Sequence, residues 1–412
     1  MSEHPVRPVL RLRKGEERRL RAGHLWIFSN EIDTAASPLA GFAPGELVQV
    51  VSARDQPLGV AYLNPSTLIA ARLLSREPQA IIDRRWFAER LRTALRLRER
   101  LTSTPHYRWV FGESDGMPGL VLDRYGEIVV GQLGTLGMQQ LRHEIEAAIR
   151  EVIAPTALVW KNDSSARHLE GLPEELTAAW GEIPETVEVR ELWPDGRMLQ
   201  FETALRLGQK TGWFYDQAFN RSLLPRFLPS GARVLDVCSY AGGWAVAAVA
   251  AGASEVSCVD ASAMALERAA DNVARHLASR DRVSPSARLL KGDAFDVLAE
   301  LAAAGERFDA VIVDPPAFIK RRKEAPQGQA AYRKLNQLAL RVLEPEGLLV
   351  SCSCSYHLSA DDLLFALQSA ARQADCQLQV LHQGGQSPDH PIHPAIPETR
   401  YLKAFFCRVM RA

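Results

Sequence analysis

Residues 313–357 read VDPPAFIKRRKEAPQGQAAYRKLNQLALRVLEPEGLLVSCSCSYH, and this stretch decides the predicted fold. It continues the apolar run Phe308–Val313, which stops at Asp314 and two prolines. An uninterrupted apolar run is typical of a strand that is buried on both faces of a parallel sheet. Proline cannot donate a hydrogen bond to a sheet, so the strand must end there. The pattern predicts a central strand that presents the carboxylate of Asp314 at its carboxyl end.

A helix and a second strand follow in the same stretch. Apolar residues at helical spacing predict a helix over about residues 330–343. The apolar run Leu348–Val350 then opens a strand whose end carries Cys352 and Cys354. Ligands of open α/β sheets bind beyond the carboxyl ends of the strands, so we expect Asp314 and Cys354 to share one pocket.

A thiol beside a carboxylate can perform addition chemistry. The thiol adds to an electron-poor ring carbon, and the carboxylate steadies the ring nitrogen. Two other interpretations of the cysteines are open at this point. Free cysteines are often buried as small apolar side chains, and Cys352-x-Cys354 has the spacing of half a zinc site. No second cysteine pair exists, and His390 and His393 lie among prolines, so we predict no metal.

The composition is that of an ordinary globular protein with two or three domains. The chain has 412 residues, of which 47% are hydrophobic and 24% charged, with zero formal net charge. Six cysteines in so long a chain do not indicate a disulfide framework. No run of about 18 apolar residues appears, and the N-terminus has no apolar signal core. We therefore expect a cytoplasmic protein with no membrane partner.

The neutral total hides a basic N-terminal end. Residues 1–100 hold 17 Lys and Arg against 11 Asp and Glu, a net charge of +6. Alternating residues and turn signals predict short strands and a small β-barrel-like domain that ends near Ser75. Its arginines are interleaved with aromatic residues, a pattern that suits RNA bases and phosphates but also an ordinary solvated face. The RNA contacts that we predict here are Arg13, Lys14, Arg21 and Trp26.

The rest of the chain predicts two further regions. Asp83 can cap a linker helix that runs to about Arg100, and a mixed α/β region follows it. From Met198 onward, strands and helices alternate, which indicates a parallel sheet. We therefore predict three domains, at residues 1–75, 76–192 and 193–412.

Acidic residues lie at or just beyond the ends of four successive predicted strands of the last domain. They are Asp236, Asp260, Asp293 and Asp314. Asp260 lies 24 residues after Asp236, the distance at which a nucleotide-binding fold places an acid on ribose hydroxyls. A cofactor with hydroxyls, an amine and an adenine edge, but without phosphates, matches these acceptors. We predict S-adenosylmethionine rather than a dinucleotide, whose triple-glycine fingerprint is absent.

Eight motifs spread along nearly the whole chain point to a known family. They are RKGEERRLRAGHLWIFSNEI, GESDGMPGLVLDRYG, GQKTGWFYDQ, DVCSYAGGWAV, VDAS, VDPPAF, VSCSCS and HPIHPAIPETRYLKAFFCRV. Together they resemble the bacterial 23S ribosomal RNA cytosine-C5 methyltransferases of the RlmI type, and the first and third distinguish this family from other methyltransferases. The resemblance implies an α/β fold with an N-terminal PUA-like β-barrel for RNA binding, a middle α/β domain and a Rossmann-like class I methyltransferase domain.

The resemblance also implies a site for S-adenosylmethionine. The residues that it places around the cofactor are Asp236, Tyr240, Gly242, Asp260, Asp293 and Asp314. Beside them we expect Phe214, Gln217, Ala261 and Ala294 at the cofactor, and Lys320 at the RNA. The family pattern Ser-Cys-Ser matches residues 353–355, which implies Cys354 as the nucleophile, whereas the family need not have a cysteine at position 352. Tyr356 stands where many relatives have glycine.

Cytosine-C5 methylation explains why these residue types are needed. C5 is too weak a nucleophile to attack a sulfonium methyl group, but a thiolate that adds at C6 makes C5 electron-rich. We expect a covalent Cys354–C6 adduct, with Asp314 holding the protonated N3 and the exocyclic amine. Some RNA cytosine methyltransferases have a second cysteine where this chain has Pro315-Pro316, so the base that removes the C5 proton is not identified here. Strand periodicity puts Cys352 and Cys354 on one face and does not choose between them.

Three other functions fit parts of the pattern. An enzyme of the same fold that methylates a base nitrogen, such as guanine N7, needs no nucleophile, so loss of Cys354 would leave its turnover nearly intact. A methyltransferase for a small molecule or a protein leaves the basic, aromatic N-terminal domain unexplained. A non-catalytic RNA-binding assembly factor would bind RNA without methyl transfer. We predict the enzyme that forms 5-methylcytidine in 23S ribosomal RNA, and a homodimer is compatible with the sequence.

Overall fold

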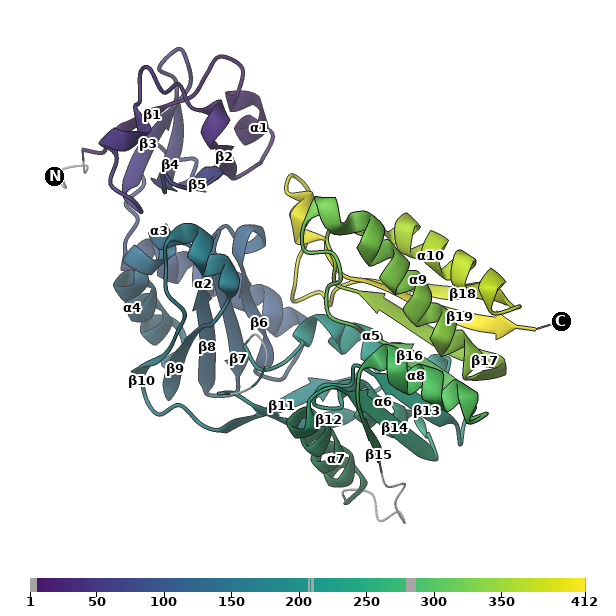
Figure 1. Cartoon of the computed structure of the whole chain (residues 1–412). Helices are drawn as coiled ribbons and strands as arrows, with labels where there is room; N and C mark the ends of the chain where they lie inside the picture. Colours follow the sequence, from purple (N-terminus) through teal and green to yellow (C-terminus); the bar gives the residue numbers. More distant parts are fainter. Residues whose placement is uncertain (1–5, 207, 209–210, 279–286, 412) are drawn as a thin grey trace. The chain divides into compact units, whose positions relative to one another are not determined.

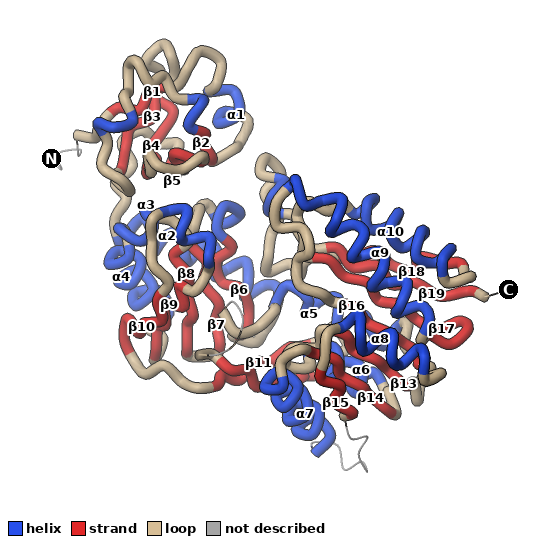
Figure 2. The backbone as a smooth tube through the Cα atoms, in the orientation of Figure 1, coloured by secondary structure: helices blue, strands red, loops and turns tan. Residues whose placement is uncertain are grey.

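The computed structural model describes residues 6–206, 208, 211–278 and 287–411 (Figures 1 and 2). The chain divides into two compact units. Unit 1 consists of Met1–Val187, Ala204–Trp213 and Asp389–Thr399, and unit 2 of Glu188–Thr203, Phe214–Pro388 and Arg400–Ala412. Each unit has its own sheets and its own apolar core.

The N-terminal part of unit 1 is a five-stranded sheet. Its strand order is β1-β3-β4-β5-β2, with β1 parallel to β3 and the other pairs antiparallel. An isolated bridge between Leu12 and Ile32 joins the two edges, so the sheet closes toward the predicted barrel. Strand β2 was not predicted, because three residues are too few for an alternating pattern to show. The elements are β1 (Val9–Arg11), α1 (Glu17–Arg21), β2 (Trp26–Phe28), β3 (Leu47–Val51), β4 (Pro57–Leu63) and β5 (Ile69–Ser75).

The second part of unit 1 is a mixed sheet with helices packed on it. Its strand order is β10-β9-β8-β7-β6, in which β8 and β9 are parallel and the other pairs antiparallel. Asp83 caps helix α2 as predicted, because its carboxylate accepts the backbone N–H of Trp86 at 2.9 Å. The elements are α2 (Arg84–Leu101), β6 (His106–Phe111), β7 (Leu120–Tyr125), β8 (Ile128–Leu133), α3 (Leu136–Gln140), α4 (Arg142–Ile153), β9 (Ala157–Asn162) and β10 (Glu175–Trp180).

The segment Asp389–Thr399 belongs to unit 1, although it lies within the predicted third domain. The guanidinium of Arg98 donates to the carbonyl of Asp389 at 2.7 Å. The Asp389 carboxylate accepts the backbone N–H of Arg108 at 2.9 Å. These contacts join residues nearly 300 positions apart, which local sequence patterns do not reveal.

Unit 2 is built on a seven-stranded sheet of order β15-β14-β13-β16-β17-β19-β18. The first five strands in this order, β15, β14, β13, β16 and β17, are parallel to one another. Strand β19 runs antiparallel to β17, and β18 runs antiparallel to β19. The observed bounds of β16 are those that the sequence predicts. The strands are β13 (Arg233–Val237), β14 (Glu255–Asp260), β15 (Arg288–Lys291), β16 (Phe308–Val313), β17 (Leu343–Ser353), β18 (Gln377–Gly384) and β19 (Lys403–Met410), and β11 (Thr186–Leu192) and β12 (Met198–Ala204) form a separate two-stranded sheet.

Helices accompany this sheet in two series. Helices α5, α6 and α7 contact one another in turn, and so do α8, α9 and α10, which lie across one face of the sheet in Figure 1. Leu298, Leu335 and Leu363 of the second series are buried against the strands. The helices are α5 (Ala218–Leu223), α6 (Gly243–Ala251), α7 (Ala263–Ala278), α8 (Ala294–Ala303), α9 (Ala325–Arg341) and α10 (Ala360–Gln373). No helix among the described residues is long and apolar enough to cross a membrane.

Helix α9 begins five residues earlier than predicted. Pro326 and Gly328 argue against a helix in the sequence, but both are tolerated here for local reasons. Pro326 lies in the first turn, where the N–H groups have no helical partner in any case. A Cβ at Gly328 would lie 2.2 Å from Cγ1 of Ile319, so only glycine lets the preceding loop pack against the helix.

Strand β17 is longer than predicted and ends one residue before Cys354. It starts at Leu343, because the chain pairs with β16 on both sides of a register shift between Phe308 and Ala310. Residues 344–347, which lie between the two paired parts of the strand, have the composition of a turn. For this reason the sequence did not predict the first part of the strand. Cys352 is therefore in the strand, and Cys354 lies just beyond it.

Candidate active site

The candidate site lies where the loops after β13 and β16 meet. Strand β13 is flanked by β14 on one side and β16 on the other, so the crossovers leave in opposite directions at this point. Such a switch point is where open α/β sheets bind ligands. The loop after β13 is tightly turned, with positive φ at Cys238 (65°), Tyr240 (48°) and Gly242 (76°). A Cβ at Gly242 would lie 2.9 Å from the backbone of Ala269, so this position requires glycine.

Asp236 is fully buried at the base of this loop. Its Oδ2 accepts the backbone N–H of Ala245 at 3.0 Å, which joins β13 to the first turn of α6. Its Oδ1 has no hydrogen-bond partner among the described residues. Burial, followed by the charge of Asp314, raises the pKa of Asp236 to about 8. A buried acceptor of this kind can receive a donor from a ligand.

The raised pKa of Asp236 gives a prediction for stability. Between the unfolded pKa of about 3.9 and the folded value of about 8, the native chain holds one more proton than the unfolded chain. Stability therefore falls as pH rises through this window, by at most about 1.4 kcal/mol per pH unit. Asp236→Asn removes this dependence. The melting temperature of the variant minus that of the wild type is therefore expected to increase with pH, by up to roughly 2–4 °C per pH unit. Thermal melts from pH 5 to 9 measure the difference.

The exposed Asp296 provides the matched control for this experiment. Asp296→Asn is expected to melt in parallel with the wild type across the same range. Parallel melting curves for Asp236→Asn as well would show that Asp236 is ionised in the native chain and would contradict the prediction.

Asp260 and Asp293 follow the next two strands and hold the loops around them. Asp260 accepts the backbone N–H groups of Tyr240 at 3.0 Å and Ser262 at 2.9 Å, so it connects the loops after β13 and β14. Asp293 is exposed and caps α8, because it accepts the backbone N–H of Phe295 at 2.8 Å. Both predicted alanines adjoin these acids: Ala261 is exposed, and the half-buried Ala294 is the first residue of α8.

Cys238 shows that the four predicted acids are close in space. Its pKa is raised first by burial and then by four negative charges. These charges belong to Asp260, Asp314, Asp236 and Asp293. The structure therefore brings all four strand-end carboxylates together around the loop that follows β13.

Asp314 is half-buried just beyond the end of β16 and is held by two donors. Its Oδ2 accepts the side-chain amide of Gln217 at 3.0 Å and the indole N–H of Trp244 at 3.1 Å. Burial raises the pKa of Asp314 to about 6, and the charge of Asp216 adds to this effect, while the hydrogen bonds oppose it. A carboxyl group with such a pKa can exchange a proton near neutral pH.

The segment that carries Phe214 and Gln217 is held by interactions of its own. The Asn220 amide donates to Oε1 of Gln217 at 2.7 Å, which directs the Gln217 amide nitrogen toward Asp314. The ring of Phe214 meets that of Tyr240 edge-on, at 5.3 Å between centroids. Both predicted cofactor contacts thus lie beside the loop after β13. Gln209 and Lys210 of the same motif are outside the described residues.

The two cysteines of β17 have different surroundings. Cys352 is fully buried, and burial raises its pKa well above the usual value, with Asp314 and Gln217 as neighbours. Cys354 is half-buried, and its charge acts on Tyr332 and Lys403. A thiol with a strongly raised pKa is a poor nucleophile, because the thiolate is the reactive form. Exposure and thiol chemistry thus favour Cys354, a choice that strand periodicity left open.

Sequence reasoning missed three residues that support the site. Trp244 and Asn220 orient Asp314 and Gln217, and Lys403 lies beside Cys354. Side-chain hydrogen bonds between distant segments leave no periodic trace. A lysine within an apolar strand, as at Lys403, was the one local signal available.

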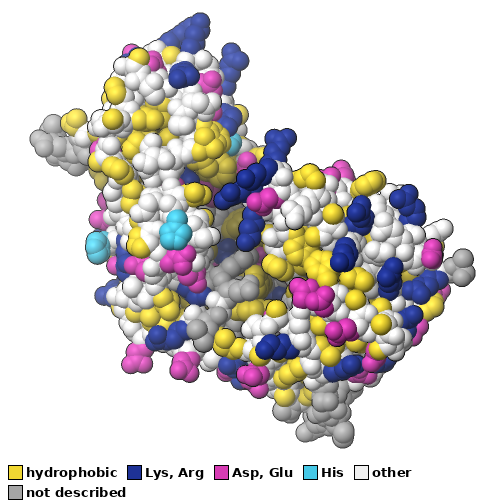
Figure 3. All heavy atoms as spheres, in the orientation of Figure 1, with side chains coloured by type: hydrophobic (Ala, Val, Ile, Leu, Met, Phe, Trp, Pro, Cys, Tyr) yellow, Lys and Arg dark blue, Asp and Glu magenta, His cyan; other side chains and the backbone are white. Residues whose placement is uncertain are grey.

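The predicted RNA contacts are spread over both units. Arg13, Lys14 and Arg21 are exposed on unit 1, and Figure 3 shows Lys and Arg side chains on the surface of its N-terminal part. Trp26 is half-buried on β2, and its indole N–H donates to Glu113 at 3.0 Å. Lys320 is exposed on unit 2, in the loop that leads from Asp314 to α9.

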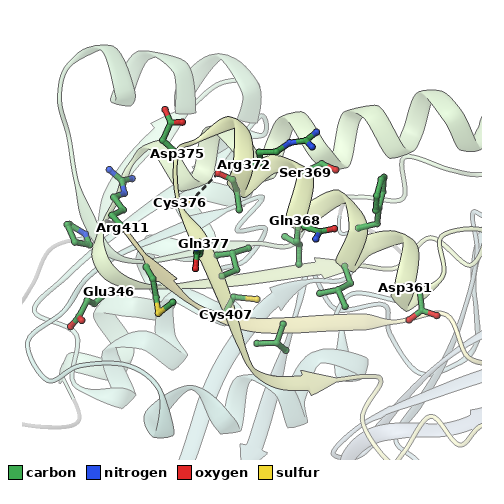
Figure 4. Close-up of a pocket in the computed structure, with 18 residues that line it drawn as sticks. Glu346, Asp361, Gln368, Ser369, Arg372, Asp375, Cys376, Gln377, Cys407 and Arg411 are labelled. Atoms are coloured by element: carbon green, nitrogen blue, oxygen red, sulfur yellow. Dashed lines mark hydrogen bonds between the residues drawn. The ribbon is translucent and has the colours of Figure 1, made fainter.

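A pocket of about 1400 Å³ lies elsewhere on unit 2, beside α10 and β18. Arg372, Asp375 and Cys376 are among its lining residues, and a hydrogen bond joins the Cys376 thiol to the carbonyl of Ala371 at 3.6 Å (Figure 4). None of the predicted site residues lines it. We therefore place the active site at the strand ends and not in this pocket.

The strand-end site fits the predicted cofactor. Its four strand-end carboxylates suit the ammonium group, the sulfonium centre and the ribose hydroxyls of S-adenosylmethionine. The unpartnered Oδ1 of Asp236 and the glycine-dependent turn at Gly242 are features of a ligand site. A cluster of four acids would repel the phosphates of a dinucleotide.

Comparisons with known proteins agree with this geometry. Residues 10–76 match the model of a PUA-like domain, and residues 139–408 match that of the S-adenosylmethionine-dependent methyltransferases. The ribosomal RNA large subunit methyltransferase I of Erwinia tasmaniensis is 35% identical over 403 residues, which cover 97% of this chain and 98% of that protein.

Two solved structures share the fold. A methyltransferase in complex with SAH has a TM-score of 0.80 at 22% identity and covers 97% of this chain and 100% of its own. A methyltransferase from Streptococcus mutans has a TM-score of 0.79 with the same coverage and identity. With the four strand-end acids and the switch-point loop in place, these matches show that the chain is an S-adenosylmethionine-dependent methyltransferase of the ribosomal RNA large subunit methyltransferase I family.

Proposed function

We propose that this chain methylates C5 of a cytosine in 23S ribosomal RNA. The observation that carries the proposal is the placement of a half-buried thiol and a half-buried carboxyl group at the ends of adjacent parallel strands. Val313 pairs with Ser351, so Asp314 follows the end of β16 beside Cys352, and Cys354 lies two residues further along, just beyond the end of β17. RNA as the substrate is supported by the match to a PUA-like domain and by the name of the relatives, ribosomal RNA large subunit methyltransferase I.

The chain's own residues have distinct roles in this proposal. Asp236, Asp260 and Asp293, with Tyr240 and the turn at Gly242, hold the cofactor, which supplies an electrophilic methyl group when bound. Phe214, Gln217, Ala261 and Ala294 complete the lining of that site. Cys354 adds to C6 of the cytosine as a thiolate, which makes C5 electron-rich. Asp314 shares a proton with N3, so charge does not build up on the ring as the thiolate adds.

The product nucleoside tests the proposal directly. Ribosomal RNA from cells that lack this protein is incubated with the chain and labelled S-adenosylmethionine, and the nucleosides are then separated. Label in 5-methylcytidine is the expected result. Label in a nitrogen-methylated base, such as 7-methylguanosine, would support the rival enzyme. RNA binding without any label would support a non-catalytic assembly factor.

The loop after Asp314 offers an RNA-binding surface in unit 2. Its residues 320–323 are Lys, Arg, Arg and Lys, and all four are exposed. The backbone N–H groups of Lys320 and Arg321 donate to Glu324, each at 3.2 Å, which fixes the loop at the start of α9. Four cations next to the site suit the phosphates that flank a target base.

Salt dependence tests this surface. The double variant Lys320→Gln/Arg322→Gln is expected to lower the magnitude of the slope of log affinity against log salt by about 1.4–1.8, because each phosphate contact contributes about 0.7–0.9. Filter binding of ribosomal RNA between low and moderate salt measures the slope. Arg372→Gln, which removes an exposed charge from α10, should leave the slope unchanged. Equal slopes for the double variant and the wild type would exclude these contacts.

Other sequence predictions remain part of the proposal. Arg13, Lys14 and Arg21 are proposed as RNA contacts because they are exposed, and Trp26 because it is only half-buried. The domain boundaries at residues 75 and 192, and a homodimer, stay predictions.

A further inference from the structure

Lys403 is a buried cation in the middle of unit 2. It is the first residue of β19, where it pairs with Ser353 across the antiparallel ladder. Its exposed fraction is 7%. The ammonium group donates to the carbonyl oxygens of Ser355 and, at 2.9 Å, of Tyr401. Lys403 thus pairs with Ser353 and donates a hydrogen bond to Ser355, and Cys354 lies between these two residues in the sequence.

No carboxylate of the described residues forms an ion pair with Lys403. Its hydrogen-bond acceptors are two neutral carbonyl groups. Burying a charge without a counter-charge costs several kcal/mol in general, so such a lysine calls for an explanation. An ammonium group has three donors, and the two carbonyls use only two of them. The charge and the third donor are available to a neighbouring anion.

The backbone around Cys354 is held on both sides. The Ser355 hydroxyl accepts the backbone N–H of Ile319 at 3.2 Å and shares a hydrogen bond of 2.9 Å with the hydroxyl of Tyr332. The backbone N–H of Ser355 donates to the hydroxyl of Ser353 at 3.2 Å. These bonds, together with the one from Lys403, hold the backbone directly after Cys354 in place.

We propose that Lys403 is a positioning residue for the nucleophile, whose ammonium group fixes the backbone after Cys354 and stabilises the Cys354 thiolate. This inference rests on the proposed function, in which Cys354 adds to C6. It deepens that function by naming the group that makes the thiolate available in a site otherwise rich in carboxylates.

The charges around Lys403 agree with this role. Burial lowers the pKa of Lys403 to about 8. The negative charge of Cys354 opposes this shift, as does that of Asp362 on α10, whereas Arg400 adds to it. Near neutral pH, below the pKa of Lys403, the charged lysine and the Cys354 thiolate stabilise each other. Above about pH 8 the lysine loses its charge, and the thiolate loses that stabilisation.

Alkylation of Cys354 tests the proposal without RNA or cofactor. The full-length chain is treated with iodoacetamide from pH 5.5 to 9.5, and modification of each cysteine is followed by mass spectrometry with fragment ions that separate Cys352 from Cys354. The pH at which the alkylation rate of Cys354 reaches half of its maximum is its midpoint. In the wild type, this midpoint is expected below the pKa of about 8.5 of a free thiol. Lys403→Gln keeps an amide that can donate to the carbonyls but removes the charge. Its midpoint is expected about one pH unit higher, which slows alkylation at pH 7 about tenfold.

Three further results make the outcome decisive. Lys403→Arg should keep most of the lowered midpoint, because it restores the charge. Lys334→Met removes an exposed charge from α9 and should leave the midpoint unchanged. A wild-type midpoint at or above about 8.5, or the same midpoint in a folded Lys403→Gln variant, would overturn the proposal. The wild-type midpoint decides the question even if the variant does not fold, and none of these readouts depends on which base is methylated.

Discussion

Cys354→Ala is expected to lower methyl transfer to ribosomal RNA by about 10³-fold or more. The reason is that C5 of cytosine does not attack a methyl donor without prior addition at C6. No other thiol among the described residues combines partial exposure with a place at the end of β17. Initial rates with labelled cofactor, at saturating and limiting RNA, separate the loss of the chemical step from any loss of RNA binding.

Cys352→Ala is the matched control, two residues away in the same strand. Cys352 is fully buried, and its raised pKa keeps it protonated. Its loss leaves a small cavity, which costs about 1 kcal/mol of stability but removes no nucleophile. We therefore expect nearly wild-type turnover. The reverse pattern, with activity lost in Cys352→Ala and kept in Cys354→Ala, would reassign the nucleophile.

A covalent trap tests the same residue independently of product formation. In RNA that contains 5-fluorocytidine, the fluorine cannot leave as a proton, so the adduct at C6 persists after methyl transfer. Wild type and Cys352→Ala are expected to give a protein–RNA complex that survives denaturing electrophoresis, and Cys354→Ala none. If the wild type forms no such complex and Cys354→Ala still methylates RNA, the chemistry is that of a base nitrogen and Cys354 is structural.

The backbone of the site could be predicted because its signals are local. Both faces of a central parallel strand are buried, so β13 and β16 appear in the sequence as short apolar runs that end near an acid. Alternating helices and strands then predict a parallel sheet, in which the carboxyl ends of the strands bring Asp236, Asp260 and Asp314 to one edge. The early start of β17 was not predictable, because its register shift depends on the neighbouring strand.

The side-chain interactions could not be predicted, because they join segments that are far apart in the sequence. Gln217 contacts Asp314 across 97 positions, and Lys403 contacts Ser355 across 48. Their energies come from burial and hydrogen-bond geometry, which periodicity does not encode. For the same reason strand periodicity could not rank Cys352 and Cys354, and within the sequence the preference for Cys354 came from the family pattern.

Asp314→Asn is the second change with a large expected effect, about 10²–10⁴-fold in kcat. The asparagine side chain has nearly the same shape, and its oxygen can still accept hydrogen bonds from Gln217 and Trp244, so the fold should persist. The amide cannot take up or release a proton. It therefore cannot share a proton with N3 of the cytosine as the thiolate adds. Single-turnover rates with bound RNA measure this loss, and Asp296→Asn on the exposed side of α8 provides the control.

The pH dependence identifies the role of Asp314. The reactive enzyme is expected to carry a proton on Asp314 and none on Cys354. The rate then depends on the fraction of enzyme with protonated Asp314 multiplied by the fraction with the Cys354 thiolate. With the pKa of Asp314 near 6 and a higher value for the thiol, kcat/KM of the wild type rises up to about pH 6, stays level, and falls above the thiol pKa. In Asp314→Asn only the thiol titrates, so the rate rises up to the thiol pKa and does not fall beyond it. The loss of the alkaline fall, with the rise moved to higher pH, is the expected signature. A variant profile that keeps the wild-type shape would show that Asp314 contributes only a fixed charge, and the proton shared with N3 would then have to come from another group.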